Sequence, residues 1–186
     1  TDNTARRLRE LWGPGGVTPR PVQDRLPIWM GYQGPQGARR AGLLGEGLLS
    51  LDAAQWEPYS AGLAEAGHPL ESGVMSGAIQ GWVSEDPERD WPLVSKHLEY
   101  QLNSYRRHMV EGTGRTEPKP VDLDRIVNTG GAGPLGNFTY GTPEFVAETI
   151  AKATAGLPVD TVFFWASLGG MPEDVTMRNI ETICTR

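Results

Sequence analysis

The sequence is nearly devoid of cysteine, since Cys184 is the only one among 186 residues. A single cysteine excludes an intrachain disulfide framework and any zinc site built from several cysteines. The sequence also lacks an uninterrupted apolar run of about 18 residues, and its charged first twelve residues lack the apolar core of a signal peptide. These absences predict a soluble protein of a reducing compartment, the cytoplasm.

Clusters of positive charge are scarce as well. The 17 basic and 23 acidic residues give a net charge of −6, and no run of basic residues is longer than two. This balance argues against nucleic acid or an anionic membrane surface as a partner. The sequence has no Gly-x-Ser-x-Gly elbow and no P-loop, so hydrolase and nucleotidase functions lack support.

What the sequence does contain is an alternation of strand-like and helix-like segments separated by glycine and proline. Strands of the buried type are predicted at residues 26–33, 47–52, 74–83 and 159–167. Helices are predicted around residues 38–44, 53–66, 86–112, 142–156 and from 172 or 173 onward. The order predicts an α/β fold with a parallel sheet in one domain, and four such strands correspond to half of a (β/α)8 barrel.

Two of these helices carry specific burial predictions. In the long helix, Asp86 is the expected N-cap, and Pro92 indicates either a start at Asp90 or a kink. Its inward stripe is predicted to comprise Trp91, Val94, Leu98, Leu102, Tyr105 and Met109. The last helix is predicted to turn Val175, Ile180, Ile183 and Cys184 inward and to be still running where the chain ends.

Two segments are predicted to lie outside this alternation. Residues 1–25 read as a connecting arm with a short helix at residues 4–12. Residues 112–137 form a long segment rich in glycine, proline and threonine, with at most one turn at residues 122–127. Loops of that length are often functional lids, so this segment is a candidate lid.

Four blocks of the sequence, in order and spacing, resemble the luciferase-like monooxygenases. The blocks are LPIWMGYQGPQGARRAGLLGEGLL, WVSEDPERDW, GTPEFVAETI and GLPVDTVFFW, and the resemblance covers about residues 26–186. It implies a (β/α)8 TIM barrel of which this chain is the C-terminal half, about four β/α units.

The resemblance also implies a function. Such enzymes bind FMN or a deazaflavin cofactor at the C-terminal mouth of the strands and act as oxidoreductases or monooxygenases on small organic substrates. It implies that this chain is an incomplete enzyme that pairs with the missing N-terminal half or forms a homo-oligomer. The alternative is a non-enzymatic flavin-binding or scaffold protein of the same fold. The catalytic residues stay unassigned, and no metal is expected.

The first candidate cofactor site is the turn formed by Gly31, Tyr32, Gln33 and Gly34. It follows a predicted strand and precedes a helix, where free backbone N–H groups and the helix dipole favour a phosphate. A tight turn with no ligand is the structural alternative. Tyr32 stands where relatives commonly have a second glycine.

The second candidate is Gly45, Glu46 and Gly47, where Glu46 replaces the usual aspartate. Its alternative is a turn that leads into the next strand, with Glu46 as a solvated or capping carboxylate. Gly169 and Gly170, after the last strand, offer a phosphate loop or a structural turn.

The remaining candidates have structural interpretations. His68, His97 and His108 follow no metal-ligand pattern and are predicted to lie at the surface. Aromatic residues in the predicted strands either stack on a flavin ring or belong to the core, and the core is the expected place for them. They are Trp29, Trp82, Phe163, Phe164 and Trp165.

Overall fold

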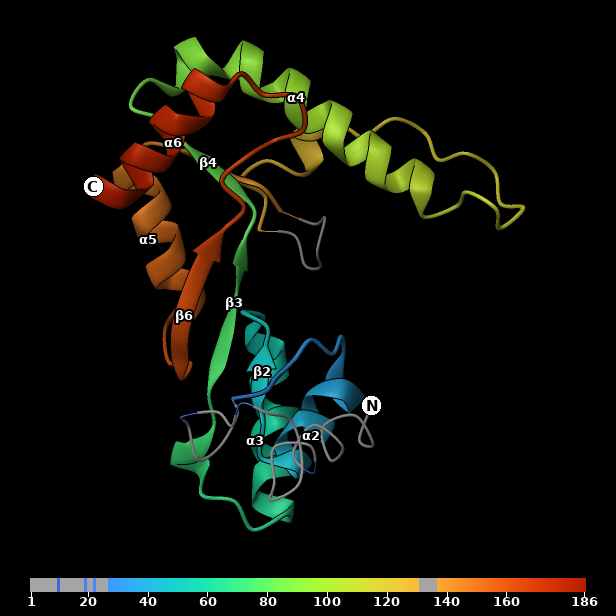
Figure 1. Cartoon of the computed structure of the whole chain (residues 1–186), viewed down its shortest axis with the longest axis vertical. Coiled ribbons are helices and arrows are strands. Elements are labelled where there is room, and N and C mark those ends of the chain that lie inside the picture. Colours follow the sequence, from blue (N-terminus) through green and yellow to red (C-terminus); the bar gives the residue numbers. More distant parts are fainter. Residues whose placement is uncertain (1–9, 11–18, 20–21, 23–26, 131–136) are drawn as a thin grey trace. The chain divides into compact units, whose positions relative to one another are not determined.

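The computed structural model describes residues 10, 19, 22, 27–130 and 137–186 (Figure 1). The predicted arm at residues 1–25 therefore falls outside the described residues, except for three isolated positions, and so does its predicted helix apart from Glu10. The described chain divides into two compact units. Unit 1 comprises residues 1–77 and 156–162, and unit 2 comprises residues 78–155 and 163–186.

Unit 1 is built on a four-stranded sheet with the strand order β1-β2-β3-β6. The strands are β1 (Trp29–Met30), β2 (Gly47–Leu49), β3 (Met75–Ile79) and β6 (Val159–Phe164), and the last residues of β3 and β6 belong to unit 2. The first three pair in parallel, with Trp29 beside Gly47 and Leu48 beside Met75. The predicted α/β fold with a parallel sheet is confirmed, although each strand is shorter than expected.

Residues 27–77 of unit 1 contain two helices. They are α2 (Pro35–Leu44) and α3 (Trp56–Glu65), accompanied by the 3-10 turns η1 (Ala53–Gln55) and η2 (Leu70–Ser72). A Cβ at Gly42 would overlap the carbonyl oxygen of Tyr59, and a Cβ at Gly62 would overlap that of Arg39. The two helices therefore cross with their backbones in contact. The core beside them consists of Ala38, Ala41, Leu48, Tyr59, Leu63 and Met75.

The described part of unit 2 contains a second parallel pair of strands and three helices. The strands are β4 (Gly81–Val83) and β5 (Thr139–Gly141). The helices are α4 (Pro87–His108), α5 (Pro143–Thr154) and α6 (Glu173–Thr185), and η3 (Leu123–Arg125) forms a single turn between α4 and β5. The buried core comprises Trp82, Val94, Leu98, Leu102, Phe138, Tyr140, Leu168 and Val175.

The expected number of strands is wrong, because the described residues contain six. The predicted strand at residues 74–83 is two strands, β3 and β4, which pair in different sheets. At the start of β4, a Cβ on Gly81 would lie 2.6 Å from the carbonyl oxygen of Thr139, so glycine permits the close approach of β5. β5 itself has three residues and no apolar run long enough to predict it.

The start of α4 tests one of the two alternatives raised by Pro92, a helix start at Asp90. The helix begins at Pro87, and the Asp86 side chain accepts a hydrogen bond from the N–H of Arg89 at 3.2 Å. The predicted N-cap is confirmed, and the alternative start at Asp90 is wrong. Pro92 lies near the helix start and removes only one backbone donor there.

The buried stripe of α4 is shorter than predicted. Val94, Leu98 and Leu102 are at most 2% exposed, but Tyr105 is 56% exposed and Met109 is 67% exposed. The expected burial of the last two residues is wrong, because the described core of unit 2 reaches along α4 only as far as Leu102.

The inward face of α6 also differs from the expectation. Val175 is buried as predicted, whereas Cys184 is exposed, and Ile180 and Ile183 are only partly buried. The buried polar residue is Asn179, one helical turn after Val175. Its side-chain amide donates to the carbonyl oxygen of Ala166 at 3.0 Å, and its side-chain oxygen accepts from the N–H of Val83 at 3.0 Å. These bonds satisfy both ends of the amide.

Candidate cofactor turn and apolar pocket

The predicted turn after β1 leads directly into α2. Gly34 is the N-cap of α2 and has a φ of 80°, a backbone conformation that residues other than glycine rarely adopt. Pro35 is the first helical residue and has the φ that a helix start requires. The sequence therefore specifies this turn through a glycine and a proline in succession.

The start of α2 has the properties of an anion-binding position. No described side chain caps the helix, and its first turn contains no acidic residue. The first intrahelical bond is donated by the N–H of Ala38 to the carbonyl oxygen of Gly34 at 3.1 Å. The N–H groups of Gln36 and Gly37 precede this bond, so they have no acceptor inside the helix and point toward its N-terminal end.

Tyr32 packs against the first turn of α2. A Cβ at Gly37 would overlap the Cβ of Tyr32, so the absence of a side chain at Gly37 makes room for the tyrosine. The Tyr32 hydroxyl is buried and has no hydrogen-bond partner among the described residues. The tyrosine found in place of a glycine therefore does not present its hydroxyl at the surface.

The second predicted segment has a structural role. Gly45 has a φ of 61° and ends α2, with its N–H donating to Gly42 and the N–H of Glu46 donating to Ala41 at 3.1 Å. This pair of bonds is the Schellman arrangement that closes many helices. A Cβ at Gly47 would lie 2.6 Å from the ring of Trp29. Both glycines are thus required by the local packing.

Glu46 is buried, contrary to one expectation from the sequence. It is 3% exposed, so the prediction of a solvated carboxylate is wrong. The residue is enclosed between the end of α2 and α3, where the Tyr59 hydroxyl donates to the Glu46 carbonyl oxygen at 2.8 Å. Burial follows from the tight Schellman turn, which directs the chain straight into β2.

The two predicted cofactor segments are not brought together. Gly31–Gly34 follow β1, whereas Gly45 and Glu46 precede β2, and β1 and β2 run in parallel. The segments therefore lie at opposite ends of the paired strands. Ligands of parallel α/β sheets bind beyond the carboxyl ends of the strands, where Gly31–Gly34 lie.

The Gly169–Gly170 segment is a turn held by α4. The N–H of Gly169 donates to the side-chain oxygen of Gln101 at 2.8 Å, and the His97 ring lies 3.0 Å from the Gly169 carbonyl oxygen through Nδ1. His97 is partly buried by this contact, so its predicted surface position is met only in part. These hydrogen bonds support the interpretation of Gly169 and Gly170 as a structural turn rather than a phosphate loop.

The other two histidines differ from each other. His108 is exposed, as predicted. His68 is partly buried, and its ring occupies the space where Gly45 would carry a Cβ, with Nε2 2.8 Å from that position. The surface prediction for His68 is therefore met only in part, because one side of its ring packs on the helix-closing Gly45.

The aromatic residues of the predicted strands divide into two groups. Trp82 is 2% exposed and belongs to the core, as predicted. Phe163 is 37% exposed and Trp165 is 61% exposed, so the core expectation is wrong for both. Their rings meet edge to face with centroids 6.2 Å apart. Trp29 and Phe164 are partly buried.

A polar network at the end of β4 was not predicted from the sequence. The Ser84 hydroxyl donates to Asp90, and the N–H of Asp86 donates to Ser84 at 3.1 Å. Arg89 also donates to Asp90 through Nε at 2.9 Å. The Arg89 guanidinium, with a smaller contribution from Ser84, holds the pKa of the Asp90 carboxyl below its usual value.

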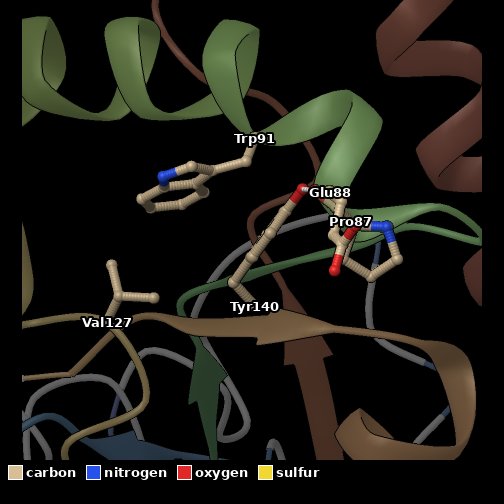
Figure 2. A pocket seen from close by; sticks show the side chains of 5 residues that line it. All are labelled: Pro87, Glu88, Trp91, Val127 and Tyr140. Carbon is tan, nitrogen blue, oxygen red and sulfur yellow. Dashed lines mark hydrogen bonds between the residues drawn. The ribbon is translucent and has the colours of Figure 1, made fainter.

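Beside this network lies a pocket of about 400 Å³ (Figure 2). Pro87, Glu88 and Trp91 contribute from α4, Tyr140 comes from β5, and Val127 comes from the preceding loop. The Trp91 and Tyr140 rings have centroids 4.8 Å apart and are tilted by 46°. The Tyr140 hydroxyl donates to the Pro87 carbonyl oxygen at 2.6 Å. Burial, followed by the nearby Asp90 carboxylate, raises the pKa of Tyr140.

Metal-binding clusters and membrane-crossing helices are not found among the described residues. In that part of the chain, no group of three or more His, Cys, Asp or Glu side chains is placed to hold a metal ion. Of the helices described, none combines the length and apolar character that crossing a bilayer requires.

No protein-family model and no curated protein matches the sequence. Solved structures do match. The monooxygenase RslO1 from Streptomyces bottropensis is 18% identical with a TM-score of 0.64. The match covers 97% of this chain and 57% of the RslO1 chain. An F420-dependent secondary alcohol dehydrogenase, solved with an F420-acetone adduct, is 16% identical with a TM-score of 0.60. The match covers 97% of this chain and 60% of the dehydrogenase chain.

A long-chain alkane monooxygenase, LadA, is 15% identical with a TM-score of 0.59, over 91% of this chain and 43% of its own. The chain thus spans between 43% and 60% of the length of these three structures. The chain thus shares its fold with two monooxygenases and an F420-dependent dehydrogenase, and the resemblance predicted from the sequence is confirmed at the level of the fold.

Proposed function

We propose that this chain is the C-terminal half of a (β/α)8 barrel oxidoreductase that uses FMN or a deazaflavin on a small organic substrate. The observation that carries this proposal is the fold similarity to RslO1 and to the F420-dependent dehydrogenase over 97% of the chain. Those proteins are described as a monooxygenase and as a dehydrogenase that uses F420. The parallel pairing of β1, β2 and β3 supports the barrel assignment.

The turn at Gly31–Gly34 is the proposed cofactor contact. The uncapped start of α2, without an acidic residue in its first turn, fits a phosphate group. The N–H groups of Gln36 and Gly37 would donate to the phosphate, and Gly34 would hold the turn open for it. When bound, the flavin or deazaflavin supplies the hydride or oxygen transfer, and the protein supplies position and electrostatics.

We propose a structural role, not a cofactor contact, for Gly45, Glu46 and Gly47. Because the Schellman turn and the Trp29 ring account for both glycines, we assign this segment to the α2–β2 connection. The cofactor site then rests on Gly31, Tyr32, Gln33 and Gly34.

A complete site requires more than this chain. The chain corresponds to 57% of RslO1 and 60% of the dehydrogenase, so the proposed barrel needs a second part. The exposed rings of Phe163 and Trp165, which contact each other edge to face, offer apolar surface that a second part would cover. The proposed partner is the N-terminal half of the barrel or a second copy of the chain.

The proposal is tested by adding FMN and, separately, a deazaflavin to the purified protein and following absorbance. Saturable binding followed by substrate-dependent oxidation of the reduced cofactor supports an enzyme. Binding without any turnover, also after addition of an N-terminal half, supports the alternative of a flavin-binding scaffold. Absence of binding to both cofactors contradicts the proposal and its alternative.

A further inference from the structure

We propose that the pocket between α4 and β5 is a binding site for an uncharged organic molecule with a flat, apolar body. All of its described lining residues belong to unit 2, and none of them belongs to the turn proposed for the cofactor. The geometry and charge of this pocket alone therefore carry the inference.

The size and walls of the pocket suit a small molecule. The pocket is a hollow of about 400 Å³ that is largely open to solvent, large enough for a small molecule to lie against its walls. Trp91 and Tyr140 supply aromatic surfaces, and Val127 faces them from the loop, as Figure 2 shows. Aromatic walls of this kind favour flat rings, which stack with an offset or meet edge to face.

The polar atoms of the pocket explain why the ligand is expected to be uncharged. The Tyr140 hydroxyl is already committed to the Pro87 carbonyl oxygen, so it is not a free donor. Glu88 is the only charged residue among the described lining residues, and it is exposed to solvent. That described lining thus offers no basic side chain that would pair with an anionic ligand.

The charges near the pocket reinforce this selectivity. Asp86 and Asp90 lie close enough to raise the pKa of Tyr140, and Glu88 adds a third carboxylate at the pocket itself. Arg89, the neighbouring cation, is engaged by Asp90 through Nε at 2.9 Å. The acidic surroundings disfavour an anion. A cation finds no free buried carboxylate among the described neighbours either, because Asp86 caps α4, Asp90 is paired with Arg89, and Glu88 is exposed to solvent.

Two fluorescent probes with the same ring systems test the proposal. N-phenyl-1-naphthylamine is uncharged, and 1-anilinonaphthalene-8-sulfonate carries an added sulfonate. We expect saturable binding of the uncharged probe to the whole protein, with affinity at least about tenfold higher than for the sulfonate. Equal or higher affinity for the sulfonate would overturn the charge argument.

Two variants locate the binding. Val127→Phe fills the pocket and is expected to weaken binding of the uncharged probe at least about tenfold. Val22→Phe adds the same ring at a fully exposed valine and is expected to leave binding unchanged. Circular dichroism and thermal melting check that each variant folds. A folded Val127→Phe protein that binds as tightly as the parent would overturn the site.

A third variant keeps the proposal testable if Val127→Phe does not fold. Glu88→Gln alters an exposed side chain, so it is expected to preserve the fold. It should strengthen binding of the sulfonate severalfold and change the affinity for the uncharged probe by less than about twofold. If neither affinity responds, both probes bind elsewhere and the proposal fails.

Discussion

The hydroxyl of Tyr59 donates a hydrogen bond to the carbonyl oxygen of Glu46 at 2.8 Å. The same hydroxyl accepts a hydrogen bond from the N–H of Val74 at 3.1 Å. Tyr59 is fully buried, and its burial raises the pKa of the phenol. One side chain of α3 thereby joins the chain just before β2 to the chain just before β3. These strands form the sheet whose edge holds the proposed cofactor turn.

The first prediction compares two tyrosines. Tyr59→Phe leaves two backbone groups without their partner, so it should lower the free energy of unfolding by about 1–3 kcal/mol. Tyr32→Phe removes a buried hydroxyl that has no partner among the described residues, so it should be neutral or slightly stabilising. Urea unfolding of both variants checks the contrast. Equal losses in the two proteins would mean that the Tyr59 bonds contribute nothing specific.

The second prediction concerns the crossing of α2 and α3. Gly62→Ala places a Cβ on the carbonyl oxygen of Arg39, which should cost about 1–3 kcal/mol through overpacking. Gly169→Ala is the control, because a Cβ there would meet its nearest atom, on the Tyr100 ring, at 3.5 Å. Thermal melting should show a lower midpoint for Gly62→Ala only. Tolerance of Gly62→Ala would indicate that the helices are not in backbone contact.

Helix starts were predictable from sequence because their signals are local. Asp86 before Pro87 and Thr142 before Pro143 each specify an N-cap followed by proline, and both caps form. The Gly34-Pro35 start of α2 carries the same proline signal without a capping side chain, but the helix was predicted to begin only at residue 38. Local chemistry fixed these positions independently of the rest of the fold.

Burial was less predictable, because it depends on which other elements reach a residue. Met109 continues the apolar stripe of α4 yet is exposed, whereas Asn179 is polar yet buried. Asn179 is accommodated by the backbone groups of Val83 and Ala166, which are distant in sequence. No periodicity in one segment encodes such partners, and the pocket at Trp91 and Tyr140 escaped prediction for the same reason.

The third prediction concerns acid stability. Because Arg89 and Ser84 lower the pKa of Asp90, its contribution to stability is present above the unfolded-state value of about 3.8. That contribution is lost as the pH falls through the lower folded-state value. Urea unfolding at a series of pH values should therefore show Asp90→Asn less stable than the parent near neutrality.

The two stability curves should converge as the medium becomes acidic, because the parent carboxylate is then protonated. Ser84→Ala, which removes one donor to Asp90, should give a smaller difference of the same sign. A constant gap between parent and Asp90→Asn at every pH would contradict an ionic role for Asp90.

The fourth prediction separates stability from binding at α2. Gln36→Glu places a negative charge in the first turn, where it should stabilise the helix by about 0.3–1 kcal/mol. The same charge should weaken FMN binding, since it competes with the phosphate for the free N–H groups. Gln36→Ala is the uncharged control and should bind as the parent does. Calorimetric titration and thermal melting measure the two effects, and tighter FMN binding by Gln36→Glu would contradict the site.

The central claim is that the turn from Gly31 to Gly34 and the start of α2 bind the cofactor phosphate. The most direct measurement is a ¹⁵N amide spectrum of the protein titrated with FMN and with riboflavin, which lacks the phosphate. We expect FMN to shift the amide signals of Gly34, Gln36 and Gly37 and riboflavin to shift them far less. Unchanged signals at saturating FMN, or equal shifts with both ligands, would contradict the claim.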